Sequence, residues 1–242
     1  MINRFYFNGE DSRKMGIFIS ERKIFGSPAR DVEYVSIPGR SGDLIVDKGR
    51  YKNTTIEYSV SIFRNVADKI RVITEWLNRK KGYVELWDTY DPDYYRYASF
   101  SNGFDAEDGK SGIATFKITF NCKPYRYKID GAGTIATTKK TLYINNPESI
   151  ESKPKIQVTG SGENGYITLT GNTQHPNNQQ ITISKINGYI DIDAESQTAT
   201  KGTENLNGVI NTADIILVPG ENRIEIGGAI NKISIQPRWR TL

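Results

Sequence analysis

Short isoleucine-rich segments and pairs of turn-forming residues fill the second half of the sequence and limit the folds open to it. Glycine, and often asparagine, tolerates the positive φ values that tight turns require. The pairs are Asn164-Gly165, Asn187-Gly188, Asn207-Gly208 and Pro219-Gly220. Around them, aliphatic residues two positions apart mark one face of a strand: Ile181 and Ile183, Ile190 and Ile192, Ile215 and Leu217, Ile224 and Ile226, and Ile233 and Ile235. Regular short strands between turns predict a β-sandwich.

The first half of the sequence also predicts antiparallel strands. Apolar and polar residues alternate over Thr55–Phe63 and again over Ile113–Cys122, which is typical of strands with one buried face. The chain is therefore expected to be mainly β, with a sandwich-like domain in each half.

One amphipathic helix is expected near residues 65–81. Its apolar stripe, which should pack on an aromatic sheet, consists of Val66, Ile70, Ile73 and Leu77. Asn65 is a candidate N-cap, and Gly82 follows the end of the helix. Glu75 and Arg79, one turn apart, are expected to form an ion pair.

The distribution of aromatic residues divides the chain in two. All nine phenylalanines precede residue 121, whereas the aromatic residues beyond Tyr143 are Tyr166, Tyr189 and Trp239. We expect an N-terminal domain over residues 1–135 and a C-terminal sandwich over residues 136–242. Residues 237–242 contain Trp239, an aromatic residue that follows the isoleucine-rich segments. These last residues are expected to pack back on the aromatic N-terminal domain.

Charge and hydropathy exclude two classes of partner. The net charge of +4 comes from scattered residues, so the sequence predicts no basic stripe for sequence-specific nucleic acid recognition. No segment approaches the roughly 20 apolar residues that span a bilayer, so no membrane association is expected. After its synthesis, the protein is expected to be located first in a cytoplasm.

The sequence contains few of the residues on which enzyme active sites commonly depend. His175 is the only histidine and Cys122 the only cysteine, so neither a serine triad nor a structural zinc site is predicted. Cys122 ends an apolar alternating segment and is expected to be buried. We therefore assign no catalytic residue, cofactor or metal ligand.

Two groups of carboxylates leave alternatives open. Asp191 and Asp193 would project from one face of a strand, with their Cα atoms about 6 to 7 Å apart. That spacing could suit the carboxylate pair of a glycoside hydrolase. Asp88, Asp91 and Asp93 could supply oxygen ligands to a calcium ion, although they lack the spacing of an EF-hand loop. A polar strand face and an Asp-Pro turn explain the same residues.

A dense aromatic segment is a candidate contact surface. It contains Tyr90, Tyr94, Tyr95 and Tyr97 around Arg96. Tyrosine and arginine are enriched among the residues that dominate protein interfaces. We therefore interpret this segment as part of an interface between subunits.

The strongest motif is Val35-Ser36-Ile37-Pro38-Gly39-Arg40-Ser41-Gly42, in which Pro38-Gly39 suits a type II turn and Gly42-Asp43 a second bend. With the opening Phe5-Tyr6-Phe7-Asn8-Gly9 and the later Lys123-Pro124-Tyr125-Arg126-Tyr127, it resembles the N-terminal domain of the distal tail protein family of siphophages that infect Gram-positive bacteria. The motif supplies further interface candidates: Tyr34, Pro38, Gly39, Arg40 and Asp43.

The resemblance implies a structural protein at the tip of a phage tail, assembled in the host cytoplasm. Members of the family form a homohexameric ring that their N-terminal domains close head to tail. The ring joins the tail tube protein and the tape-measure protein to a tail-associated adhesion or lysin protein. The resemblance implies these partners for this chain too.

The same resemblance implies a galectin-like C-terminal sandwich and hence a second function, carbohydrate recognition at the virion surface. The residues that partly match the galectin sugar site are His175, Asn177, Glu221 and Arg223. Gln179 stands where the galectin pattern has arginine.

Overall fold

The computed structural model describes residues 3–22, 26–109, 112–211 and 214–242. These residues form a mainly β protein with antiparallel sheets and one α-helix, which confirms the predicted fold class. The chain divides into two compact units, residues 1–126 with Leu242, and residues 127–241. No helix among the described residues is long and apolar enough to cross a membrane.

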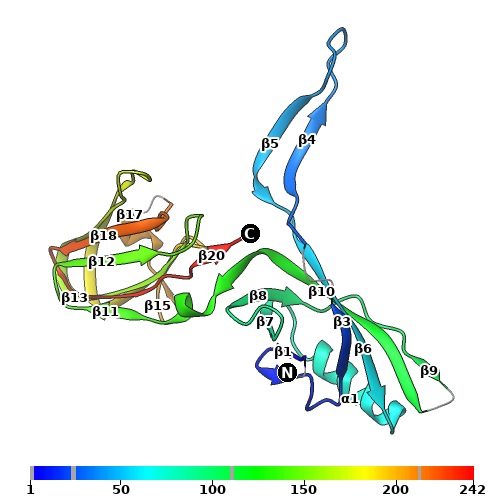
Figure 1. Cartoon of the computed structure of the whole chain (residues 1–242). Helices are drawn as coiled ribbons and strands as arrows, with labels where there is room; N and C mark the ends of the chain where they lie inside the picture. Colours follow the sequence, from blue (N-terminus) through cyan, green and yellow to red (C-terminus); the bar gives the residue numbers. More distant parts are fainter. Residues whose placement is uncertain (1–2, 23–25, 110–111, 212–213) are drawn as a thin grey trace. The chain divides into compact units, whose positions relative to one another are not determined.

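The first unit is built on an antiparallel sheet with the strand order β2-β1-β7-β8-β10-β6-β3, and β9 pairs with β10 (Figure 1). Its strands are β1 (Phe5–Phe7), β2 (Glu10–Asp11), β3 (Phe18–Arg22), β6 (Thr54–Phe63), β7 (Val84–Asp88), β8 (Tyr94–Ser99), β9 (Glu107–Gly109) and β10 (Ile113–Lys128). The two segments with predicted alternation become β6 and β10, which pair over ten residues. Cys122 is fully buried on β10, as expected.

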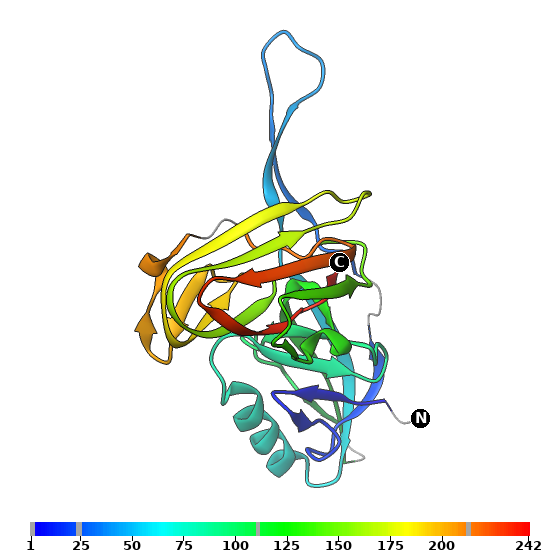
Figure 2. The same cartoon turned by 90° about the vertical axis from the view of Figure 1, so that its left-hand side faces the viewer.

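Helix α1 (Val66–Asn78) packs its apolar side on this sheet (Figure 2). The Trp76 ring, which the predicted stripe omits, stacks on Phe5 with ring centroids 5.7 Å apart. Phe5 in turn stacks on Tyr58 of β6 at 4.7 Å. The expectation of an aromatic sheet beneath the helix is confirmed.

Two details of the predicted helix are wrong. Asn65 adopts a left-handed conformation with φ of 50° and makes no side-chain cap hydrogen bond, because the chain leaves β6 through two residues of positive φ. An N-cap normally has extended backbone angles. Arg79 does not pair with Glu75; its Nη1 lies 2.9 Å from Oε1 of Glu10, at the start of β2.

Strands β4 (Arg30–Val35) and β5 (Leu44–Tyr51) form a separate two-stranded sheet in the first unit. This β4–β5 hairpin extends away from the larger sheet of the same unit (Figure 1). An isolated two-stranded hairpin is at best marginally stable in water.

The second unit is a β structure around an isoleucine-rich core. Its strands follow the order β11-β19-β13-β14-β15-β16, while β12 pairs with β18, β18 with β13, and β17 with β14. The elements are η1 (Ile129–Ala132), β11 (Ile135–Thr137), β12 (Thr141–Asn146), β13 (Lys155–Thr170), β14 (Asn178–Asp193), β15 (Thr198–Lys201), β16 (Glu204–Asn205), η2 (Asn207–Val209), β17 (Ile210–Asn211), β18 (Gly220–Gly227), β19 (Ile230–Gln236) and β20 (Arg240–Thr241). All ten aliphatic residues of the predicted strand pairs are buried in this core.

Two of the predicted turns are bends within long strands. Asn164 and Gly188 have positive φ values, 58° and 88°, but they lie inside β13 and β14, which pair along nearly their full length. The first part of β13 pairs with β19 and its last part with β18. The left-handed residues therefore bend a continuous strand pair between these neighbours, a role that the local sequence pattern does not distinguish from a hairpin turn.

Candidate assembly interface

The β4–β5 hairpin exposes apolar side chains on both of its faces. Tyr34 pairs with Ile45 on one face, and the next pair, Val35 with Leu44, points to the other because strand side chains alternate. Tyr34 is 64% exposed and Ile45 59%. The exposed large apolar residues between β4 and β5 are Tyr34, Val35, Ile37, Leu44, Ile45 and Val46.

A tight turn shapes the tip of the hairpin. The Arg40 N–H donates to the Ile37 carbonyl at 3.1 Å, and Gly39, two residues after Ile37, has φ of 80°. These are features of the type II turn predicted from Pro38-Gly39. The turn leaves Pro38, Gly39 and Arg40 exposed, together with Asp43 on the returning chain.

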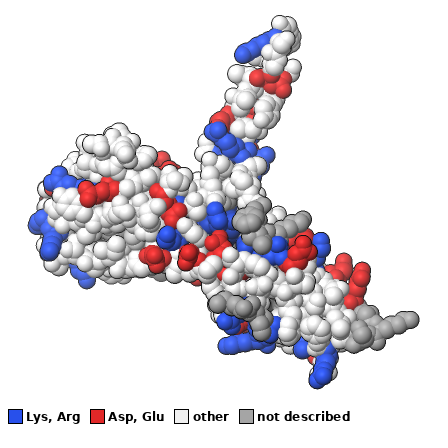
Figure 3. Space-filling model, in the orientation of Figure 1, with Lys and Arg blue, Asp and Glu red and all other residues white. Residues whose placement is uncertain are grey.

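Ion pairs concentrate in the half of the hairpin nearer the sheet. Asp31 lies 2.7 Å from Nε of Arg50, and Arg30 pairs with Asp47 across the strands. The hydrogen bond from Arg50, with the positive charges around it, holds the pKa of Asp31 below its usual value despite the opposing effect of burial. Toward the tip, few charged residues are visible (Figure 3). The exposed large apolar residues lie in this outer half, so it is the apolar half.

The aromatic segment does not form one continuous exposed patch. Tyr95 is 7% exposed and Arg96 8%, so both lie inside the first unit. The other three tyrosines are half-buried. The guanidinium of Arg126 lies over the ring of Tyr94 at 5.6 Å, and the Tyr90 hydroxyl accepts a hydrogen bond from Asn3. Only Tyr90, Tyr94 and Tyr97 keep surface that a neighbour could contact.

A buried polar network lies next to this segment. The Tyr58 hydroxyl donates to Oδ2 of Asp88, and Arg22 Nε lies 3.1 Å from the same oxygen. Burial, followed by the charge and hydrogen bond of Asp88, raises the pKa of Tyr58 well above its usual value. Oδ1 of Asp88 accepts the N–H groups of Tyr90 and Asp91. Sequence patterns missed this network because its members are far apart in the chain.

The candidate calcium ligands are separated by these contacts. Asp88 is buried and occupied by its hydrogen bonds, while Oδ2 of Asp91 lies 3.3 Å from Nη1 of Arg126. Among the described residues, no group of three or more His, Cys, Asp or Glu side chains could hold a metal ion.

The candidate sugar residues lie in two places in the second unit: His175 and Asn177 in the loop before β14, and Glu221 and Arg223 on β18. Nδ2 of Asn172 donates to the carbonyls of Pro219 and Glu221, which ties the loop carrying His175 to the turn before β18. The side-chain amide of Asn177 donates to the Ile216 carbonyl at 3.5 Å. Arg223 pairs with Glu225 at 2.6 Å. These contacts occupy Arg223 and Asn177 within the chain.

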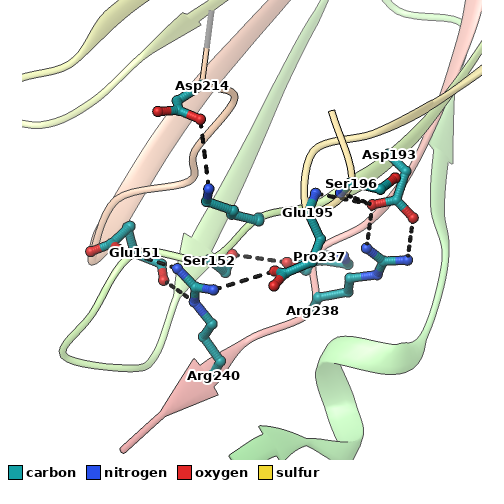
Figure 4. Close-up of polar contacts among 10 residues, drawn as sticks. Glu151, Ser152, Asp193, Glu195, Ser196, Asp214, Pro237, Arg238 and Arg240 are labelled. Atoms are coloured by element: carbon teal, nitrogen blue, oxygen red, sulfur yellow. Dashed lines mark hydrogen bonds and ion pairs between the residues drawn. The ribbon is translucent and has the colours of Figure 1, made fainter. Parts of the chain in front are cut away.

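The two strand aspartates, Asp191 and Asp193, have separate partners. Both Nη atoms of Arg238 donate hydrogen bonds to the Asp193 carboxylate at 2.8 Å (Figure 4). The backbone N–H groups of Glu195 and Ser196 also donate to this carboxylate. Burial alone would raise the pKa of Asp193, but these donors and the charge of Arg238 outweigh it and lower the pKa. Asp191 accepts a hydrogen bond from Gln157.

The last residues of the chain pack in both units. Trp239 belongs to the isoleucine-rich core of the second unit. Arg240, only 3% exposed, donates to the Glu151 carbonyl at 2.8 Å and lies 3.4 Å from Glu195 (Figure 4). Leu242 belongs to the first unit, where its carbonyl oxygen accepts hydrogen bonds from Arg126.

Comparison with known proteins gives this geometry its context. Residues 11–122 match the model of the phage tail protein RIFT-related domain. This segment of the chain is similar to that family. The RIFT-related domain includes the β4–β5 hairpin, helix α1 and most of the first sheet.

The fold of the whole chain also has a known counterpart. The crystal structure of the SPP1 Dit (gp 19.1) protein, described as a paradigm of the hub adsorption apparatus in phages infecting Gram-positive bacteria, matches with a TM-score of 0.76 and 14% identity. The match covers 100% of both chains. The resemblance to distal tail proteins is thus confirmed by the family model in the first unit and by the fold throughout. No curated protein matches the sequence.

Proposed function

We propose that this protein is a structural subunit of the hub at the tip of a phage tail, assembled in the host cytoplasm as a homohexameric ring. The observation that carries the proposal is the β4–β5 hairpin of the RIFT-related domain, whose apolar residues are uncovered on both faces. Monomeric soluble proteins rarely leave a large contiguous apolar surface exposed. A neighbouring copy of the chain supplies the cover.

In the proposed ring, the hairpin of one subunit would be covered by a different surface of the next subunit. In a head-to-tail contact, each subunit inserts one surface into a different surface of the next, and the series closes when the rotation returns to the first copy. The hairpin extends from the larger sheet of its own unit and so reaches beyond it (Figure 1). The half-buried tyrosines Tyr90, Tyr94 and Tyr97 are candidates for the receiving side.

The proposed partners follow from the likeness to distal tail proteins. The ring would connect the tail tube protein and the tape-measure protein to the tail-associated adhesion or lysin protein. Its role is structural, and the ion pair between Asp193 and Arg238 supports that view because it engages one of the two candidate catalytic carboxylates.

The mass of the purified full-length chain in solution tests this proposal, with light scattering after size exclusion and electron microscopy of the main peak. We expect a species of six chains with a central opening. A monomer at high concentration that also fails to form rings when mixed with its tail partners would refute the proposal.

Carbohydrate recognition by the second unit is the second candidate function. Tyr166 is 40% exposed, and its ring lies against Gly227, where a Cβ atom would meet it at 2.2 Å. The ring therefore lies close to the Gly227 backbone, and the exposed part of Tyr166 is surface that a sugar could contact. Gln180 and Thr182 of the adjacent strand line a groove beside it.

Calorimetric titration with fragments of host cell-wall glycan tests this second function. Binding at millimolar sugar that Tyr166→Ala abolishes would support it, with Tyr143→Ala as the control for another exposed tyrosine of the same unit. No heat of binding to the wild-type protein would remove this function.

A further inference from the structure

The groove beside Tyr166 is lined by polar side chains of one chemical kind. Its volume of about 500 Å³ lies in the range of roughly 300–1,000 Å³ that is typical of ligand sites. Apart from Tyr166, its polar side chains are amides and hydroxyls: Asn164, Gln180, Thr182, Ser184 and Asn211. None of the described residues that line the groove carries a charge. The groove therefore offers hydrogen bonds but no ion pair.

The register of the strands places these side chains next to the tyrosine ring. Thr182 of β14 pairs with Tyr166 of β13, and Asn211 of β17 pairs with Thr182. Gln180 lies two residues from Thr182 on the same face of β14. Directly paired side chains on one face have their Cβ atoms about 4.5–5.5 Å apart. A ring-shaped ligand that lies against Tyr166 thus has hydrogen-bonding groups along one of its sides.

Most of the polar groups in the groove are not engaged within the chain. In the part of the structure that is described, the side chains of Asn164, Gln180, Thr182 and Asn211 make no hydrogen bond. These side chains are also exposed. Ser184 differs, because its hydroxyl donates to the Val209 carbonyl at 3.2 Å. The donors and acceptors of the other four remain available to a ligand.

Amide and hydroxyl side chains favour an uncharged polar ligand. Proteins bind phosphate and carboxylate groups with arginine, lysine or clusters of backbone N–H groups. An anion in this groove would lose its hydration without gaining a counter-charge. On the same face of the sheet, the charges of Arg223 and Glu225 already pair with each other at 2.6 Å. The hydroxyls of an uncharged sugar both donate and accept, and so match the amides and hydroxyls of the groove.

We propose that this groove binds an uncharged sugar unit of a cell-wall glycan, and not a unit that bears phosphate or carboxylate. The sugar ring lies against Tyr166, and its hydroxyls bond to Thr182, Gln180 and Asn211. The inference rests on carbohydrate recognition, the second function proposed above, and adds the class of sugar. None of the residues that partly match the galectin pattern lines this groove.

Cell-wall glycan of a Gram-positive host, released and separated by anion exchange into uncharged and anionic fractions, supplies the probes. Calorimetric titration of the full-length protein should show binding of the uncharged fraction only. Its dissociation constant should change by less than about twofold between about 50 and about 500 mM salt, since no ion pair forms. Equal or stronger binding of the anionic fraction, or a steep loss of affinity with salt, would overturn the class of sugar but leave carbohydrate recognition in place. Absence of binding to both fractions would remove the function itself.

Two threonines on the same face of the sheet give a matched pair of variants. Thr182→Val removes a hydroxyl from the groove, so it should weaken binding of the uncharged fraction about two- to tenfold. Thr170→Val makes the same change outside the groove, on the strand that carries Tyr166, and should leave the affinity unchanged. Wild-type affinity of Thr182→Val, or equal losses in the two variants, would overturn the site. The comparison of the two fractions needs only the wild-type protein, so it decides the class of sugar even if a variant fails to fold.

Discussion

Replacing two exposed residues of the β4–β5 hairpin should dissolve the proposed ring without unfolding the subunit. The variant Tyr34→Ser with Ile45→Ser removes the apolar pair with the greatest exposure in the hairpin. In a free subunit, residues this exposed contribute little to the core. Their loss should therefore leave the stability of the monomer nearly unchanged, while it removes the surface that a neighbour covers.

The size of the effect follows from the exposed area. At 64% exposure, and with roughly 200 Å² for a whole tyrosine side chain, Tyr34 offers about 130 Å² to a neighbour. Burial of that area contributes about 3 kcal/mol at about 25 cal/mol per Å². Ile45, 59% exposed, adds about 1–2 kcal/mol. A loss of about 4 kcal/mol per contact weakens each interface about a thousandfold.

Light scattering over a range of protein concentrations measures this shift. Rings of the double variant should require far higher concentrations than those of the wild type, while far-ultraviolet circular dichroism and melting temperature stay the same. Tyr143→Ser is the matched control, because Tyr143 is 59% exposed on β12 of the second unit. Intact rings of the double variant at the wild-type concentration would refute the reasoning, as would equal disruption by the control.

Three further changes test the interior of the two units. Asp193→Asn should destabilise the protein at neutral pH by about 1–3 kcal/mol, because the charged acceptor for Arg238 is lost. Since the folded-state pKa of Asp193 is lowered from 3.8, the wild-type advantage should persist above about pH 4 and vanish as the pH falls through that lowered value; an advantage unchanged in acid would contradict this. Tyr58→Phe should cost about 1–3 kcal/mol in urea unfolding because Asp88 loses a buried donor, and an unchanged midpoint would count against the network. Gly160→Ala should lower the melting temperature, since its Cβ would lie 1.9 Å from a carbonyl oxygen in the turn between β18 and β19; a melting temperature at or above wild type would exclude that clash.

Periodicity predicted the elements whose two sides meet different surroundings. One side of β6 and β10 faces the core and the other side is more polar. The alternation of apolar and polar residues in their sequences therefore matches the alternation of buried and less buried side chains in the structure. Helix α1 was predictable for the same reason. Its cap and its ion pair were not, because the conformation of Asn65 and the partner of Arg79 depend on the strands on either side.

Charged residues inside the first unit escaped the same reasoning. Tyr95 and Arg96 are neighbours on β8 and point to opposite faces, yet both are buried. Alternation of apolar and polar residues along a strand predicts burial for only one of two such neighbours. Arg96 was therefore interpreted as part of a contact surface, although its burial depends on Leu86 and other residues distant in sequence.

The hairpin motif was visible in the sequence, but its role depends on a property that only the structure describes. Pro38-Gly39 predicted the turn, whereas the pairing of Tyr34 with Ile45 and of Val35 with Leu44 places apolar side chains on both faces. Contact through the edge of a sheet would cover neither face. A hairpin that is apolar on both sides is stabilised only when it lies between two surfaces. We therefore expect each hairpin in the ring to insert between two elements of its surroundings, and a ring structure in which one face of the hairpin stays in solvent would contradict this.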